Sequence, residues 1–128
     1  MGNLSAHFDR SEFRCKCGNC QENAVSPLLI ERLESVRELA ERPIVIRSGC
    51  RCPAHNVAEG GKADSAHLTD LARKEYCEAA DIETPTTRDR FYLVQAAIRT
   101  GVWRIGIGKN FIHLDVDAGK DDEVMWLY

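Results

Sequence analysis

The sequence predicts an α+β fold in which two main helices pack on a small, mostly antiparallel sheet. Two observations predict it. Two segments repeat apolar residues at helical spacing, and the last part of the chain alternates apolar and polar residues as paired strands do. The chain has 128 residues, of which 44% are hydrophobic and 29% charged, so we expect one domain over residues 1–128.

The first helix follows a polar, cysteine-containing segment, residues 1–25, which we expect to form an irregular arm. Ser26 is a natural N-cap, Pro27 suits the first helical position, and Pro43 ends the pattern. The apolar positions of this helix are Leu29, Leu33, Val36 and Ala40.

Strands and a second helix are expected further along. Residues 44–47 and 79–83 read as short strands, 50–64 as a loop, and 68–76 as about two helical turns. Thr86 or Thr87 can cap the second helix, and Gly101 suits the position just after it. Its predicted apolar stripe is Phe91, Val94, Ala97 and Ile98. Residues 103–119 read as a hairpin, with 125–128 as an edge strand.

Charge and hydropathy exclude several classes of protein. The net charge is 17 minus 20, or −3, with both signs interspersed, which argues against a general nucleic-acid binder. No apolar run approaches the roughly 20 residues of a membrane span. The N-terminal residues lack a basic start followed by an apolar stretch, so we see no secretory signal and expect cytoplasmic synthesis. We also expect a monomer.

Six cysteines is a high number for this length, and without a secretory signal it favours metal ligands or thiols over a disulfide framework. Two of them form a Cys-x-x-Cys pair typical of zinc sites, and a Cys-x-Cys pair offers two more ligands. A second metal site, disulfides and unlinked thiols all stay open. The cysteines are Cys15, Cys17, Cys20, Cys50, Cys52 and Cys77.

Histidines and aspartates in the second half of the chain suggest a metal site. Alternation along "FIHLDV" puts His113 and Asp115 on one face of a strand and apolar residues on the other. His67 follows a glycine-containing loop, and Asp81 lies in the strand predicted over 79–83. Two histidines and one carboxylate are the protein ligands of many hydrolytic zinc sites.

These motifs resemble the zinc D-alanyl-D-alanine carboxypeptidase family, whose zinc-site architecture hedgehog signalling domains share. The matching pieces are "SAH" (65–67), "AADI" (79–82) and "FIHLDV" (111–116), with "IRSGCRCPAHN" and "HFDRSEFRCKCG" upstream. The resemblance implies that His67, Asp81 and His113 bind Zn²⁺. It also implies that Arg51 binds a substrate carboxylate and that Ser65 helps to hold substrate, although a loop arginine and a turn serine are the plainer readings.

Two departures from the family pattern concern catalysis. Relatives often carry an acid three residues before the second histidine, where this chain has Asn110. Asp115 is the best substitute as general base, or else it orients a ligand histidine. The family's Asp also follows its His by about seven residues, whereas Asp81 follows His67 by fourteen.

An unbroken helix would separate His67 from Asp81 by about 21 Å, too far to share one ion. We therefore expect an insertion near residues 69–77 that loops out, with Cys77 pinned to Cys50 or Cys52. Asp70, one helical turn after His67, is the alternative ligand.

The resemblance implies a zinc metallopeptidase that hydrolyses a D-amino-acid-containing bond in a peptidoglycan stem peptide, as carboxypeptidase or endopeptidase. Because we see no secretory signal, we expect a phage or prophage protein that acts at the cell wall. The alternative is a catalytically inactive, metal-stabilised cell-wall-binding module, which the asparagine in place of the acid favours.

Overall fold

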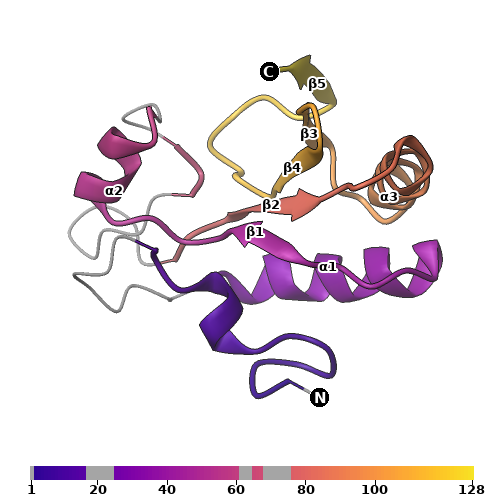
Figure 1. Ribbon diagram of the computed structural model, residues 1–128, viewed down its shortest axis with the longest axis horizontal. Coiled ribbons are helices and arrows are strands. Elements are labelled where there is room, and N and C mark those ends of the chain that lie inside the picture. Colours follow the sequence, from indigo (N-terminus) through magenta and orange to yellow (C-terminus); the bar gives the residue numbers. More distant parts are fainter. Residues whose placement is uncertain (1, 17–24, 61–64, 68–75) are drawn as a thin grey trace.

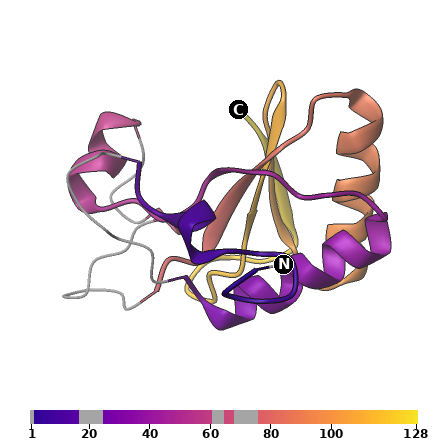
Figure 2. The ribbon, with the colours of Figure 1, turned by 60° about the horizontal axis from the view of Figure 1, so that its bottom comes forward.

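The computed structural model describes residues 2–16, 25–60, 65–67 and 76–128, and it has the predicted α+β architecture (Figure 1). Figures 1 and 2 show α1 and α3 next to each other at one side of the strands, with α2 at the other end of the molecule. The elements are η1 (Arg10–Phe13), α1 (Pro27–Ala40), β1 (Ile46–Ser48), α2 (Pro53–Ala58), β2 (Ala79–Glu83), α3 (Thr87–Arg99), β3 (Arg104–Ile107), β4 (Phe111–Asp115) and β5 (Val124–Leu127).

The five described strands form one sheet in the order β1-β2-β4-β3-β5. Every neighbouring pair is antiparallel except β3 and β5, which are parallel. The predicted hairpin is therefore confirmed as β3 and β4, and the predicted edge strand is β5. Alternation along the central strands sends Ile82, Ile112 and Leu114 to the helices and leaves the opposite face for polar side chains.

Helix α1 begins and ends where the sequence predicts. The Ser26 hydroxyl accepts a hydrogen bond from the Leu29 amide, and Pro27 occupies the first helical position. Glu41 ends the helix in the left-handed conformation, with φ of 54°. Its buried face includes the four predicted apolar positions, so the periodicity located the core side of this helix correctly.

The predicted apolar stripe of α3 was wrong in part. Phe91 and Ile98 are 61% and 48% exposed, and the buried residues are Leu93, Ala96 and Ala97. Both stripes have helical spacing, so periodicity could not choose between them. The face with two alanines packs against α1, because small side chains allow close approach of two helices. The Thr86 cap is confirmed, as is Gly101 just beyond the helix, with φ of 92°.

Two other segments differ from the sequence prediction. The first strand is Ile46–Ser48 instead of 44–47, because pairing with β2 begins at Ile46 and is interrupted by a bulge. Residues 53–58, predicted as loop, form α2, in which Pro53 takes the first helical position. The helical turns predicted over 68–76 lie largely outside the described residues.

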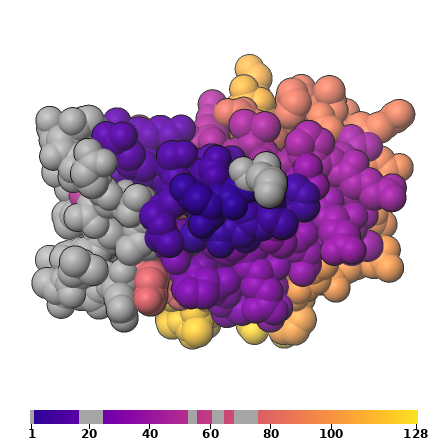
Figure 3. Space-filling view, turned by 90° about the horizontal axis from the view of Figure 1, so that it is seen from below, coloured from indigo at the N-terminus to yellow at the C-terminus, as the bar shows by residue number. Residues whose placement is uncertain are grey.

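The described part of the N-terminal arm lies across α1, as the space-filling view in Figure 3 shows in indigo over violet. Glu34 of α1 holds it: its carboxylate accepts hydrogen bonds from the Ser5 hydroxyl and the His7 amide, and pairs with the His7 ring at 2.7 Å. Burial alone would raise the pKa of Glu34, but the Ser5 and His7 interactions outweigh it and lower that pKa.

A disulfide joins Cys50, just after β1, to Cys77, just before β2. The two cysteines are 27 positions apart in the sequence, and the loop that they close contains His67. The bridge matches one of the two pairings expected for Cys77. The Cys52 amide contacts Cys15 Sγ at 3.4 Å, while Cys17 and Cys20 lie outside the described residues. None of the helices described is long and apolar enough to cross a bilayer.

We expect Glu34→Gln to lower the free energy of unfolding by roughly 1–2 kcal/mol at neutral pH, through weaker hydrogen bonds to the arm. A carboxylate with a lowered folded-state pKa stabilises the protein above its unfolded pKa, and that contribution disappears as pH falls through the folded value. The difference between wild type and variant should therefore shrink below about pH 4. Urea unfolding across this range measures it, with the exposed Glu31→Gln as control; a constant difference would contradict the assignment.

We expect the double variant Cys50→Ala, Cys77→Ala to lose roughly 2–4 kcal/mol of stability, as loop closures of this length typically contribute. Urea unfolding with and without reductant is the measurement. Reductant should destabilise wild type and leave the double variant unchanged. Equal sensitivity of both proteins to reductant would show that this bridge does not stabilise the fold.

Candidate metal centre

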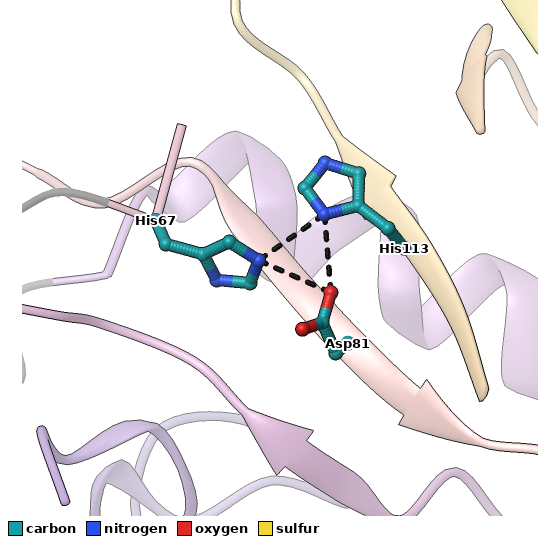
Figure 4. Close-up of side chains that lie close together, drawn as sticks. All are labelled: His67, Asp81 and His113. Atoms are coloured by element: carbon teal, nitrogen blue, oxygen red, sulfur yellow. Dashed lines mark hydrogen bonds and ion pairs between the residues drawn. The ribbon is translucent and has the colours of Figure 1, made fainter. Parts of the chain in front are cut away.

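Three predicted ligands meet on the polar face of the sheet (Figure 4). His67 Nε2, Asp81 Oδ1 and His113 Nδ1 lie 3.1 Å from one another in each pair. All three residues are buried. Among the described residues, they form a group that could hold a metal ion.

The sheet fixes two of these residues and a loop brings the third. Asp81 of β2 and His113 of β4 are direct cross-strand partners, so their side chains emerge side by side. His67 comes from the loop between α2 and β2. Its carbonyl accepts a hydrogen bond from the Arg51 amide, and the Ala66 carbonyl accepts one from Glu78. His67 and Asp81 are therefore not joined by one continuous helix, as the ligand assignment requires.

Hydrogen bonds select one tautomer for each histidine. His67 Nδ1–H donates to the Gly49 carbonyl at 2.7 Å, which leaves Nε2 as an acceptor. His113 Nε2–H donates to Asp115 Oδ2 at 2.7 Å, which leaves Nδ1 as an acceptor. Both free lone pairs face Asp81 Oδ1 (Figure 4). Three acceptors at this separation repel one another unless a proton or a cation lies between them.

The electrostatics of the group favour positive charge. Burial by itself would lower the pKa of His113, but its hydrogen bonds to Asp115 and Asp81 and their charges raise it. Burial would raise the pKa of Asp81, but hydrogen bonds from His113 and His67 in their protonated forms outweigh it and lower that pKa well below its ordinary value. The same cluster therefore suits a divalent cation once the histidines are neutral.

The donor set fits zinc in chemistry and in spacing. Nitrogen and carboxylate donors about 2.0–2.1 Å from a tetrahedral ion lie roughly 3.4 Å apart, close to the separations found here. Each histidine also donates its other N–H to an oxygen acceptor, as metal-bound histidines usually do.

Arg51 and Ser65 lie beside the donor set. The Arg51 guanidinium is 3.5 Å from Asp81 Oδ2 and 3.4 Å from the Ser48 hydroxyl, with its side chain 13% exposed. Ser65 Oγ accepts a hydrogen bond from the His67 amide, so this serine shapes the turn that carries His67. Arg51 is thus placed to meet an anionic group next to the ion.

Asp115 lies on the opposite edge of the His113 ring from the donor set. Besides His113, its carboxylate accepts hydrogen bonds from Arg104 Nε at 2.8 Å and from the Asp117 amide at 3.1 Å. Burial would raise the pKa of Asp115, but His113 outweighs it, and the Asp117 amide and Arg104 charge lower that pKa further. This carboxylate holds the histidine rather than facing the space between the donors.

The sequence left two residues uncertain, the asparagine in place of the family's acid and the alternative ligand, and the structure describes the first of them. Asn110 is exposed at the start of the turn into β4, and its side chain accepts a hydrogen bond from Arg47. Asp70, the alternative ligand, lies outside the described residues.

Sequence reasoning missed four contributors to the site: the Gly49 carbonyl, Arg104, Trp126 and Tyr128. A carbonyl leaves no signal in a sequence. Arg104 alternates with Gly106 on one face of β3, so the hairpin register could have placed it opposite Asp115. The aromatic pair depends on the parallel pairing of β5, which the sequence did not indicate.

Comparison with known proteins identifies the family of this chain. A search of curated proteins finds no match. The family model described as Peptidase M15 matches residues 6–115, a span that includes His67, Asp81, His113 and Asp115. The chain therefore belongs to the M15 peptidases, the family of zinc D-Ala-D-Ala carboxypeptidase-like enzymes.

Proposed function

We propose that this chain is a zinc metallopeptidase that hydrolyses a D-amino-acid-containing peptide bond in a peptidoglycan stem peptide, as carboxypeptidase or endopeptidase. Family membership supports a metallopeptidase in general terms. The observation that carries the proposal is the donor set of His67, Asp81 and His113, whose lone pairs converge at 3.1 Å. Phage or prophage origin and action at the cell wall stay part of the proposal.

Zinc, when bound, lowers the pKa of its water toward 7 and polarises a substrate carbonyl. The protein's own residues supply orientation. The Gly49 carbonyl and Asp115 hold the two histidines in the tautomers that a cation needs. The planar guanidinium of Arg51 can donate two parallel hydrogen bonds, which suits a carboxylate at the end of the substrate.

For Asp115 we propose orientation of His113 as its main role. Its contacts with His113, Arg104 and the Asp117 amide use most of its acceptor capacity. A general base must also reach the proton that it takes, directly or through one water. Asp115 reaches the site through the His113 ring instead.

A second function has a specific observation in its favour. Among the residues described, the carboxylates in contact with the donor histidines are Asp81 and Asp115, and Asn110 replaces the acid found in relatives. A metal-stabilised module that binds cell-wall peptide without hydrolysing it would have this composition. Hydrolysis is what separates the two functions.

We expect wild type to bind a single zinc ion and to release a D-amino acid from a stem peptide ending in D-Ala-D-Ala, or to cut a cross-linked one. His113→Ala removes a donor, so zinc affinity should fall by more than the roughly 100-fold typical of losing an outer partner, and hydrolysis should be lost. Zinc analysis and mass spectrometry of the peptide products measure both.

The matched control is His7→Ala, which removes a histidine on the N-terminal arm that pairs with Glu34. It should leave zinc content and hydrolysis unchanged. Zinc-loaded wild type that binds the peptide without cleaving it would favour the binding module. Full hydrolysis by His113→Ala would contradict the metal centre itself.

We expect Asp115→Asn to weaken zinc binding about 10- to 100-fold, because the His113 ring loses its charged partner. If Asp115 only orients His113, saturating zinc should restore most of the hydrolysis. Asp117→Asn, two residues further along the chain, is the control and should change neither property. Hydrolysis that stays absent in a fully zinc-loaded variant would instead make Asp115 the general base.

A further inference from the structure

The metal centre continues across the sheet as a row of cross-strand partners. Asp81 of β2 pairs with His113 of β4, His113 with Gly106 of β3, and Gly106 with Trp126 of β5. Cross-strand partners share a face of the sheet, so Trp126 lies on the same face as the donor set. Tyr128 follows two residues later, and its amide donates to the Ile107 carbonyl.

Gly106 makes room for aromatic rings to lean toward the metal centre. A Cβ atom on this residue would lie 2.6 Å from Tyr128 Cε2 and 2.7 Å from Trp126 Nε1, too close for either ring to stay in place. With no side chain between them, the Trp126 and His113 ring centroids are 5.3 Å apart. Because Gly106 of β3 has no side chain, the Trp126 ring of β5 can lie next to the metal centre.

Trp126 and Tyr128 are placed differently in this pair. Trp126 is partly buried, with the Arg104 guanidinium 5.3 Å above its ring, and the ring centroids of Trp126 and Tyr128 are 6.4 Å apart. Tyr128 packs against Phe111, with 5.2 Å between ring centroids, yet it is 68% exposed. Trp126 thus supports the Tyr128 ring, which is exposed to solvent.

The Tyr128 hydroxyl is able to donate a hydrogen bond at neutral pH. A tyrosine hydroxyl ordinarily titrates at about pH 10, so that of Tyr128 carries its proton at neutral pH. The ring centroids of Tyr128 and His113 are 6.5 Å apart, which places Tyr128 beside the donor set.

Arg51 and Tyr128 lie on opposite sides of the donor set. Arg51 contacts Asp81 of β2, whereas the aromatic rings lie over β3, two strand spacings or about 10 Å away. An extended peptide covers that distance in about three residues. A substrate with its terminal carboxylate at Arg51 would therefore bring the one or two residues before the scissile bond to Tyr128.

We infer that Tyr128 is a substrate-binding residue for the acyl side of the scissile bond, with Trp126 as its positioning residue. Its hydroxyl donates to a backbone carbonyl of the peptide, and its exposed ring packs against an uncharged aliphatic side chain. This inference rests on the proposed peptidase function, and it specifies a peptide that is aliphatic and neutral just before the bond that is cut.

The first test compares Tyr128→Phe and Tyr128→Ala with wild type, using zinc-loaded protein and a stem peptide ending in D-Ala-D-Ala. Loss of one hydrogen bond should raise KM about 2- to 13-fold in Tyr128→Phe with kcat nearly unchanged. Loss of the ring as well should raise KM further in Tyr128→Ala. Tyr92→Phe, on α3 beside Arg42, is the matched control and should behave as wild type. Unchanged KM in both Tyr128 variants overturns the inference, and the peptidase function would still stand.

The second test does not depend on hydrolysis. The chain has two tryptophans, so Trp103→Phe leaves Trp126 as the sole tryptophan, whose emission can be excited selectively. Titration with the stem tetrapeptide product should shift Trp126 emission, and the added substitution Tyr128→Phe should weaken the apparent affinity by a similar factor. This result in a protein that cleaves nothing would support Tyr128 as a peptide-binding residue and reject the peptidase. Saturable binding that leaves Trp126 emission and the Tyr128→Phe affinity unchanged overturns the inference.

Discussion

The structure depends on the convergence of three acceptor atoms in a buried position. His67 Nε2, Asp81 Oδ1 and His113 Nδ1 lie 3.1 Å apart with their lone pairs directed inward, which is unfavourable without positive charge between them. The raised pKa of His113 and the lowered pKa of Asp81 both express this demand for charge. A proton meets it only in part, whereas a divalent cation can satisfy all three atoms together. The fold thus maintains an arrangement that a metal ion would stabilise.

Separate parts of the chain enforce that convergence. The β2–β4 register places Asp81 beside His113, and this cannot change without moving every side chain of both strands to the wrong face. His67 is held by its loop: the Gly49 carbonyl fixes its ring, the Arg51 amide binds its carbonyl, and the Cys50–Cys77 disulfide closes the segment around it. On the other edge, Asp115 and its partner Arg104 hold the His113 ring. Each of the three donor residues therefore has its own support.

The sequence predicted the elements whose signals are local. A serine cap and a proline located α1, and alternation along β4 put His113 and Asp115 on one face. The prediction from sequence failed where two alternatives had equal local support. Helix α3 has two apolar stripes of the same period, and only packing against α1 buries the one with Ala96 and Ala97. The side of the His113 ring on which Asp115 lies depends on a rotamer, which alternation does not determine. The parallel pairing of β5 needs a chain crossover, so nothing near Trp126 could indicate it.

In the proposed function, the arrangement of the site also separates metal binding from substrate choice. The donor residues and their supports lie on β2, β4 and the loops around Cys50 and His67. Trp126 lies on β5 and Tyr128 directly after it. This strand pairs with β3 alone, and its aromatic side chains reach the metal centre over Gly106, a residue with no side chain. If the proposed peptide-binding role is correct, substitutions on β5 can alter the shape of the acyl-side surface while the positions of the three donors stay fixed by other strands. The proposed peptidase could then keep its donor set and vary its peptide preference at the sheet edge.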